Sequence, residues 1–565
     1  MKRVFSLLLI VLMLTPALHS AAFAGNTVKA KVSEGSTFFD GEQKQAHGFT
    51  ILGNNYYSLR DIAANFSGTS SQFDIAWNKK NNAIEIITGQ AYTPVESEDS
   101  KYYSRSSSYN ATLSNSRVLL DGQLQTIKAY TVDGSNYFQL RDLASKIPFE
   151  LEYDNKLGTL SMFSKVPDNA YRVKTAAAAG SNAESSYFPR WKSTVTSYLV
   201  NNLDGTISAV KADEKVTIET YNAQYELTAT QSVANELPMF GGFYSGEKYN
   251  YIAFGQDNRE ENDSKEVIRI VRYDKSFNRI DSVSIKGGES YTVVPFDAGA
   301  GRMAESGDTL VFHTSRERYT TEDGLNHQSQ LTIIVNTGTM TVTNDLGRFQ
   351  KNHVSHSFDQ YVQFDGSAHV LVDHGDAYPR SIVLNKGDGT SYSEVDLFKI
   401  PGKIGANTTG VSVGGFEMSS DSYIVAINSI DHSLVREYTS FEMVGLETDQ
   451  RDIILGVLPK NSLSSTSVNQ ITLAKYVGTG LIASIPKLVK ITDDKMMVLW
   501  QEFDKEDHRG DLKYVFVDGA GKAAGAIQTI KHFVLSEGNP IVSGGKIVWY
   551  TDNKDSRLFY TIPLN

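Results

Sequence analysis

The stretch Val271-Arg272-Tyr273-Asp274-Lys275-Ser276-Phe277-Asn278 has a pattern of strand and turn residues that recurs through most of this chain. Apolar and polar residues alternate up to Tyr273, as they do in a half-buried β-strand. Asp274 to Asn278 then supply the residue types that favour tight turns. The stretch therefore predicts a strand and the turn of a β-hairpin.

Hairpins of this kind recur along the last four hundred residues. They are expected at Tyr221, Tyr273, Val335, Leu384, Val444 and Val517. The steps between them are 52, 62, 49, 60 and 73 residues. A loose period near sixty, with strands ahead of each turn, is typical of a β-propeller. We expect about seven four-stranded blades over residues 190–565, with a pair of β-sandwiches as the alternative.

A near-continuous apolar strand precedes the turn in most of these units. The expected strands are Tyr251–Phe254, Thr309–Phe312, His369–Val372, Ser422–Val425, Met496–Trp500 and Lys546–Tyr550. Such strands suit the interior of a blade, where both faces of the sheet are buried. The last unit is short of a strand. We expect a strand around Val195–Asn201 to complete it and to close the ring, because closure removes exposed sheet edges.

An internal duplication occupies the N-terminal region. Ile51–Ala63 recurs as Val132–Ala144, at an offset of 81 residues. Each copy predicts a Gly/Asn turn, a short aromatic strand that runs into a short helix, and then a hairpin. Leu59 and its helical neighbours Ile62 and Ala63 fall on one helix face. The region is thus expected to be a small α+β domain ahead of a mostly β chain.

Three segments of the first copy carry a family resemblance: Tyr56–Ala63, Phe73–Asn78 and Asn82–Ile86. They resemble the copper amine oxidase N-terminal-like domain, a stalk module often found in tandem in secreted and surface proteins of Gram-positive bacteria. The resemblance covers residues 28–164, with repeats at about 28–92 and 113–164. It implies an appended stalk and not amine oxidation.

The oxidase itself would need a Thr-x-x-Asn-Tyr-acid segment, whose tyrosine becomes the quinone, and a His-x-His pair for copper. Neither pattern occurs in the sequence, and His353 and His356 are spaced as His-x-x-His. The chain is therefore not expected to be an amine oxidase. The repeated pairs Arg60-Asp61 and Arg141-Asp142 are interpreted as structural charges on short helices.

The first residues have the three zones of a secretion signal. Lys2 and Arg3 are followed by the apolar run Val4–Leu14 and by Ala22-Phe23-Ala24, a small-x-small cleavage pattern. Residues 1–24 are therefore expected to be a signal peptide cleaved near Ala24, and no later apolar stretch is long enough to span a membrane. Residues 165–189, rich in small side chains, are expected to be a linker.

The composition narrows the class of protein. The chain of 565 residues has no cysteine, so disulfides, thiolate metal sites and a cysteine nucleophile are excluded. Its net charge is -11, and its lysines and arginines are scattered. Nucleic acid is therefore not an expected partner, because phosphate binding needs a concentrated basic face.

The densest polar cluster follows the expected strand His369–Val372. Its candidate binding residues are Asp373, His374, Asp376, Tyr378 and Arg380. With His353 and His356 nearby in sequence, the aspartates and His374 could bind a divalent cation. The alternative is an inter-strand loop ordered by aspartate caps and Asp-Arg pairing. The acidic segments 258–266 and 503–511 are interpreted as solvated hairpin tips.

The preferred function is a secreted or cell-surface, non-enzymatic binding protein. The stalk would present the propeller to an extracellular glycan, peptide or protein ligand, with the cell wall as a further candidate partner. One alternative is an extracellular propeller hydrolase acting on polysaccharide or ester substrates, and another is a purely structural surface spacer. No cofactor is implied, no metal is identified, and no established catalytic motif occurs in the sequence.

Overall fold

The computed structural model describes most of the chain after the predicted signal peptide. The described residues are 27–33, 35–39, 42–69, 71–94, 108–154, 158–164, 167–177, 182–406, 408–439, 443–445, 449–553 and 556–564. The signal peptide expected at residues 1–24 lies outside this part. Within it, no helix combines the length and the apolar character needed to cross a bilayer.

Two compact units make up the chain. The first comprises Met1–Thr37 and Lys44–Phe149, and the second comprises Phe38–Gln43 and Glu150–Asn565. The strands near residues 38–43 and 150–163 therefore cluster with the second unit. The domain boundary expected at residue 164 stays a prediction.

The first unit is built around a closed six-stranded barrel. Its strands, in order around the barrel, are β1 (Val28–Val32), β4 (Gly48–Ile51), β5 (Asn54–Ser58), β12 (Ser135–Gln139), β11 (Ala129–Val132) and β8 (Ser108–Leu113). Each copy of the duplication supplies three strands. The barrel core consists of four residue pairs, each pair 81 positions apart: Ala30 and Ala111, Phe49 and Tyr130, Ile51 and Val132, Tyr56 and Tyr137. The duplication thus produces one shared core.

A short helix follows the aromatic strand in each copy, as expected. These helices are α1 (Leu59–Phe66) and α2 (Leu140–Ala144), and Leu59 and Leu140 are buried. Asp61 accepts a hydrogen bond from the backbone N–H of His47 at 2.6 Å, and Asp142 accepts one from Lys128 at 3.0 Å. The repeated aspartates therefore hold the preceding chain segment, in line with a structural role.

The remaining strands of the duplication pair across the two copies. One four-stranded sheet has the order β10 (Gln123–Gln125), β9 (Arg117–Leu120), β7 (Ala83–Thr88) and β6 (Phe73–Asn78). The other has the order β13 (Glu150–Asp154), β14 (Thr159–Phe163), β2 (Thr37–Phe39) and β3 (Glu42–Gln43). Each sheet therefore joins a hairpin of one copy to a hairpin of the other.

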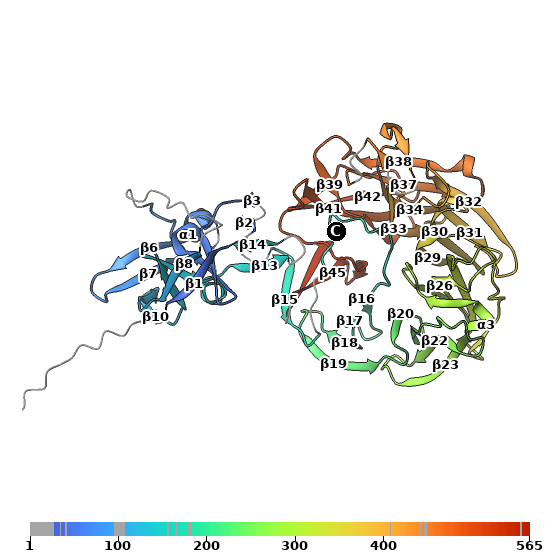
Figure 1. Ribbon diagram of the computed structural model, residues 1–565, viewed down its shortest axis with the longest axis horizontal. Helices are drawn as coiled ribbons and strands as arrows, with labels where there is room; N and C mark the ends of the chain where they lie inside the picture. The colour runs from blue at the N-terminus through green and yellow to red at the C-terminus, as the bar shows by residue number, and fades with distance from the viewer. Residues whose placement is uncertain are drawn as a thin grey trace, which may run out of the picture. The chain divides into compact units, whose positions relative to one another are not determined.

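The second unit contains a β-propeller. Its described residues form seven consecutive sheets of four or five strands, and Figure 1 shows these sheets arranged radially around a common axis. The innermost strands are β16 (Ser197–Asn201), β20 (Met239–Ser245), β25 (Arg302–Ser306), β29 (Ser357–Asp365), β33 (Val411–Met418), β40 (Lys487–Thr492) and β44 (Ile541–Ser543). The expected fold class and the expected seven blades are confirmed.

The second strand of each blade is buried along nearly its whole length. These strands are β17 (Ile207–Ala212), β21 (Asn250–Gly255), β26 (Thr309–Arg318), β30 (Ala368–Asp376), β34 (Ser422–Ser429), β41 (Lys495–Asp504) and β45 (Lys546–Asn553). Six of them contain the near-continuous apolar strands expected from the sequence. Neighbouring blades pack on both faces of these strands, which explains why the apolar run is unbroken.

The outer half of each blade is a hairpin. The third strands are β18 (Lys215–Tyr221), β22 (Glu266–Tyr273), β27 (Gln328–Asn336), β31 (Arg380–Gly387), β37 (Asp452–Pro459), β42 (Arg509–Val517) and β46 (Ser556–Pro563). The outermost strands are β19 (Leu227–Ala234), β23 (Arg279–Lys286), β28 (Thr341–Val342), β32 (Tyr392–Lys399), β38 (Asn469–Ala474), β43 (Gln528–Ile530) and β15 (Ala170–Lys174).

Several short strands and helices are added to the seven blades. Two extra strands, β24 (Thr292–Pro295) and β39 (Leu481–Ala483), extend the third and sixth blades by pairing with β26 and β41. The other short elements are α3 (Gly287–Ser290), the 3-10 helices η1 (His432–Leu434) and η2 (Ser465–Ser467), and the hairpin of β35 (Glu437–Tyr438) with β36 (Met443–Val444). The hairpin expected at Val444 is therefore wrong as a blade turn, because the third strand of that blade is β37.

A strand from before the first blade closes the ring. β15 pairs with β46 and becomes the outermost strand of the last blade, which also contains β44 and β45. Tyr198, in contrast, lies in β16, whose one partner among the described strands is β17 of the first blade. The expectation that a strand around Val195–Asn201 closes the ring is wrong. The closing strand instead lies inside residues 165–189, so that segment is not a linker throughout.

Buried charges lie at the closing seam between the last and first blades. The Arg557 guanidinium donates to Asp552 Oδ1 at 2.8 Å and to Glu219 Oε2 at 2.9 Å. Lys211 Nζ donates to Asp552 Oδ2 at 2.9 Å. Arg557, Asp552 and Glu219 are almost fully buried, so each charge depends on its partners for stabilisation.

Candidate functional site

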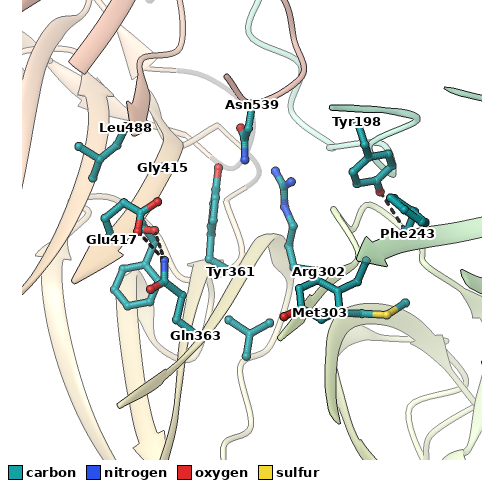
Figure 2. Close-up of a pocket in the computed structure, with 13 residues that line it drawn as sticks. Tyr198, Phe243, Arg302, Met303, Tyr361, Gln363, Gly415, Glu417, Leu488 and Asn539 are labelled. Atoms are coloured by element: carbon teal, nitrogen blue, oxygen red, sulfur yellow. Dashed lines mark hydrogen bonds between the residues drawn. The ribbon is translucent and has the colours of Figure 1, made fainter. Parts of the chain in front are cut away.

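The inner strands of the propeller line a cavity of about 220 Å³ (Figure 2). The lining combines aromatic rings, two amides, one guanidinium and one carboxyl group. Its residues are Tyr198, Phe243, Tyr244, Arg302, Met303, Tyr361, Val362, Gln363, Gly415, Phe416, Glu417, Leu488 and Asn539.

Arg302 and Tyr361 form the centre of this lining. The guanidinium carbon of Arg302 lies 5.0 Å from the centroid of the Tyr361 ring, within the range of a cation–π contact. Its Nε atom is buried and has no hydrogen-bond partner in the described structure. Burial raises the pKa of the Tyr361 hydroxyl, so this side chain is a neutral phenol at physiological pH.

Glu417 and Gln363 lie on the other side of Tyr361 (Figure 2). Gln363 Nε2 donates to Glu417 Oε2 at 2.9 Å and to the Phe416 carbonyl at 2.8 Å. Burial raises the pKa of Glu417 to about 7, although the Gln363 amide and the charge of Lys490 favour its ionised form. A substantial fraction of Glu417 is therefore protonated at neutral pH, in which state it can donate a hydrogen bond.

Two ion pairs lie at the N-terminal ends of the inner strands. Lys192 Nζ lies 4.0 Å from Asp359 Oδ2, and Lys487 Nζ lies 3.7 Å from Glu184 Oε2. Burial raises the pKa of Asp359 and lowers that of Lys192, while the attraction between the two charges opposes both shifts. Asp359 and Glu184 are therefore each paired with a lysine.

The segment 182–196 crosses this end of the propeller. Its Glu184 N–H donates to Leu535 O, its Ser186 hydroxyl donates to Asp507, and its Val195 N–H donates to Ala300 O. The guanidinium of Arg451 lies 3.9 Å from the ring centroid of Phe188 in the same segment. The segment thus contacts the last, sixth, fifth and third blades before the first blade begins at β16.

The sequence-predicted binding residues are in the fourth blade, and most serve its packing. Asp373 and His374 lie within β30, which continues to Asp376, so they are in a strand and not in the inter-strand loop of the alternative interpretation. Buried Asp373 accepts from Ser357 Oγ at 2.7 Å and lies 3.1 Å from His313 Nε2. These contacts tie β30 to the neighbouring strands β29 and β26.

The other predicted residues differ in exposure. Asp376 is buried and its Oδ1 lies 3.0 Å from His356 Nδ1. Burial lowers the pKa of His374 to about 3, so its imidazole is neutral. Arg380 donates to the backbone carbonyls of Asp376, Ala406, Thr408 and Pro401. The side chain of Tyr378 is 68% exposed and is therefore the one member of the predicted set that is open to a large ligand.

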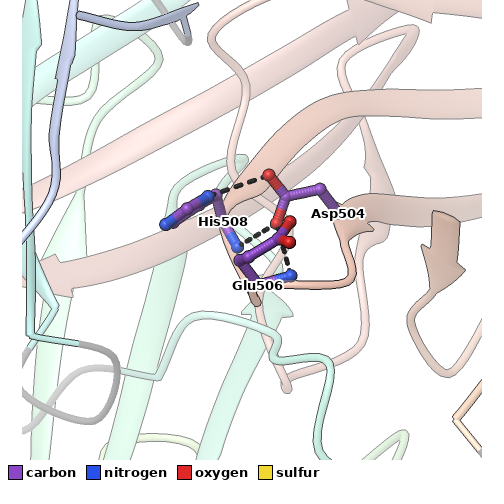
Figure 3. A group of neighbouring side chains, drawn as sticks. All are labelled: Asp504, Glu506 and His508. Atoms are coloured by element: carbon purple, nitrogen blue, oxygen red, sulfur yellow. Dashed lines mark hydrogen bonds and ion pairs between the residues drawn. The ribbon is translucent and has the colours of Figure 1, made fainter. Parts of the chain in front are cut away.

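A metal site at this cluster has no support from the geometry. In the described part of the chain, the one group of three potential ligands within 4.8 Å of one another is Asp504, Glu506 and His508 (Figure 3). Asp504 Oδ1 accepts the backbone N–H groups of Glu506 and His508, each at 2.9 Å. Asp274 makes the same pair of bonds, to Ser276 and Asn278, in another hairpin. The arrangement is thus a recurring turn, as expected for segment 503–511.

The cavity residues were not predicted from the sequence, because no motif or neighbouring residue marks their positions. Arg302, Tyr361 and Glu417 are in three different strands and are more than fifty residues apart along the chain. Only the ring brings them together. A usable signal would have been a polar residue on the inner strand of several blades in turn, but that requires the inner strands to be recognised first.

Comparisons with known proteins show no family for this chain. No known protein family matches the chain, and no curated protein is significantly similar to it. Similar solved structures include the N-terminal domain of Nup159 (8% identity, 70% of this chain and 96% of that chain, TM-score 0.32). Another is the β-propeller domain of the Trilobed protease from Pyrococcus furiosus (12% identity, 66% and 96%, TM-score 0.33).

A protein of unknown function from Dyadobacter fermentans is also similar (10% identity, 62% of this chain and 100% of that chain, TM-score 0.36). At these scores the fold assignment rests on the strand pairings of the chain itself. A β-propeller of this kind is compatible with a binding or a structural role.

Proposed function

We propose that this protein is an exported, non-enzymatic binding protein whose propeller holds part of an extracellular ligand in its axial cavity. The observation that carries the proposal is Arg302, a cation that lines the cavity without a hydrogen-bond partner at its buried Nε. Buried polar atoms are normally satisfied, and an unsatisfied one calls for an explanation such as an absent ligand or ion. Aromatic rings beside it offer apolar contact area.

The ligand would be a glycan, a peptide or a protein segment. The exposed rings of Tyr187, Trp191 and Tyr378 supply further apolar contact area for such a ligand outside the cavity. Arg190 stacks on Trp191 at 4.2 Å and restrains its indole ring. We include Tyr378 and the neighbouring Asp376 and Arg380, which were predicted from the sequence, as the part of the fourth blade nearest to such a ligand.

Arrays of glycans and peptides test this proposal directly. Asn539 lines the cavity with an exposed side chain, so Asn539→Trp should fill the space and abolish binding of the best array ligand. Asn469→Trp is the matched control, because Asn469 is exposed on the outermost strand β38. Equal binding by both variants would place the ligand elsewhere. No ligand on any array would favour a structural spacer.

Export and surface presentation are the second part of the proposal. The basic start, apolar run and Ala22-Phe23-Ala24 pattern support secretion, with cleavage near Ala24. The duplicated segments that resemble the copper amine oxidase N-terminal-like domain support a stalk role for residues 28–164. Secreted material should begin at or near Gly25 on N-terminal sequencing, and an intact Met1 would contradict export by this route.

A propeller hydrolase is the second candidate. It is favoured by Glu417, because a carboxyl group with a pKa of about 7 beside a cavity is suited to act as a general acid. Release of reducing ends from polysaccharides, or of acids from esters, would support this candidate if Glu417→Gln abolished it. A protein that binds a ligand and leaves it intact would support the binding function.

A further inference from the structure

The charges around the cavity leave one cation unmatched. Among the described residues, Arg302 forms no ion pair within 4.0 Å, whereas Lys192 and Lys487 face Asp359 and Glu184 at 4.0 and 3.7 Å. Asp359 interacts electrostatically with Arg302, but Lys192 has the larger effect on it. Since these two carboxylates already have cations of their own, and Glu417 lies on the other side of Tyr361, the guanidinium of Arg302 is the group with capacity for an added anion.

The position of Arg302 is fixed by its neighbours. It begins the inner strand β25, which pairs with β26, and its side chain stacks against the Tyr361 ring. Figure 2 shows the guanidinium and the Asn539 amide directed toward the same space beside Tyr361. A planar, stacked guanidinium presents its N–H groups as a fork that matches the two oxygens of a carboxylate.

The rest of the lining suits a hydroxylated ring. Asn539 offers an amide with both donor and acceptor atoms, and Gln363, which donates to Phe416 O and Glu417, presents its carbonyl oxygen. Glu417 in its neutral form adds a hydroxyl donor. Tyr244 and Phe416 also contribute to the lining, although the Phe416 ring packs in the core between the fourth and fifth blades.

The size of the cavity limits the ligand. A volume of about 220 Å³ is below the range of roughly 300–1,000 Å³ that holds drug-sized ligands. It therefore fits one ring and not an oligomer. We propose that the axial cavity binds a single hexuronate residue, free or at the end of an acidic glycan, with its carboxylate on Arg302 and its hydroxyls on Asn539, Gln363 and Glu417.

This inference rests on the proposed binding function, and NMR titration of the full-length protein tests it. The probes are D-galacturonate, its neutral counterpart D-galactose, and N-acetylglycine as a carboxylate without a sugar ring. Galacturonate should bind at least tenfold more tightly than either of the other probes. Arg302→Met should weaken galacturonate binding at least tenfold and leave galactose binding unchanged, since it removes a charge-assisted pair.

Lys522→Met is the matched control, because it removes the same charge from an exposed turn of the sixth blade and should leave galacturonate binding unchanged. Thermal unfolding of each variant checks its fold. If Arg302→Met does not fold, Arg302→Lys and Asn539→Ala replace it. Each should weaken galacturonate binding at least threefold, because the forked donor or the amide is lost.

The possible results distinguish failure of the hexuronate site from failure of the proposed binding function. Galactose binding as tight as galacturonate binding, or no effect of any Arg302 substitution, would overturn the carboxylate site and leave a binding protein. N-acetylglycine binding as tight as galacturonate binding would assign the site to a peptide C-terminus instead of a sugar. If all three probes fail while an array ligand is blocked by Asn539→Trp, only the hexuronate inference is lost.

Discussion

The N-terminal barrel and the propeller are both repetitive, but only the barrel shows its repetition in matching residues. The barrel core pairs residues exactly one repeat length of 81 positions apart, such as Phe49 with Tyr130. The blades share an order of strands and have little residue identity to match. In the barrel, both copies pack their equivalent residues into one core, so a change in one copy affects the other. A blade packs only on its neighbours and needs only apolar alternation and a turn.

Substitutions at the closing seam between the last and first blades should have the largest effect on stability. Arg557→Met would leave Asp552 and Glu219 buried without their shared cation. We expect the free energy of unfolding of the second unit to fall by roughly 3–5 kcal/mol, as for other broken buried pairs. Chemical denaturation followed by tryptophan fluorescence measures it, since Trp500 and Trp549 are buried in the last two blades.

Arg279→Met is the control for that experiment. Arg279 pairs with Glu236 near the surface of the second blade, where an ion pair contributes less than about 1 kcal/mol. If both substitutions had the same small effect, the seam would not limit the stability of the ring.

The barrel predicts a different result, namely equal effects in the two copies. Leu59→Ala and Leu140→Ala each remove a buried side chain at equivalent positions, and each should cost roughly 2–5 kcal/mol. Leu52→Ala, at a position that is 65% exposed, should change stability by less than about 0.5 kcal/mol. Urea unfolding of the three variants provides the comparison. A large effect in only one copy would show that the duplication no longer acts as a symmetric core.

The smallest expected effect belongs to the cavity, where Glu417 is a group that titrates near neutral pH. Glu417 has a folded-state pKa of about 7, above its ordinary value of 4.5. Its contribution to stability is therefore full below about pH 4.5 and is lost as the pH rises toward 7. Glu417→Gln should match the wild-type protein near pH 4 and exceed its unfolding free energy by on the order of 2 kcal/mol at pH 8.

Unfolding free energies measured at both pH values test this expectation. A difference between wild type and Glu417→Gln that did not change with pH would mean that the pKa of Glu417 is the same in the folded and unfolded states, so that Glu417 is ionised at neutral pH. In that case neither its donor role toward a ligand nor a general-acid role could hold.

Much of the architecture could be predicted because it depends on local pattern. The apolar strands around Tyr251, Thr309 and Trp500 were recognisable, since burial on both faces removes polar residues from the sequence. The strand that closes the ring was not recognisable. Ala170–Lys174 is short and partly polar, as an outermost strand can be, because one side of it faces solvent.

The candidate site shows the same limit. The cluster around Asp373 was predicted as a site because its polar residues are adjacent in sequence. In the folded chain, Asp373 instead makes hydrogen-bond contacts with Ser357 and His313. The cavity residues Arg302, Tyr361 and Glu417 are isolated in sequence and were not predicted. Adjacency along the chain and convergence in space are different properties, and a ring of blades separates them widely.

The duplicated α+β region and the long series of β-hairpins can be recognised in the sequence, since periodicity and turn chemistry are local. The strand that closes the ring, the matching of charges and the side chains that meet on the axis become known only from the folded chain. Strand pairing and ion pairing join residues more than 150 positions apart, as β15 with β46 and Lys192 with Asp359. Their energies depend on burial, which no single stretch of sequence defines.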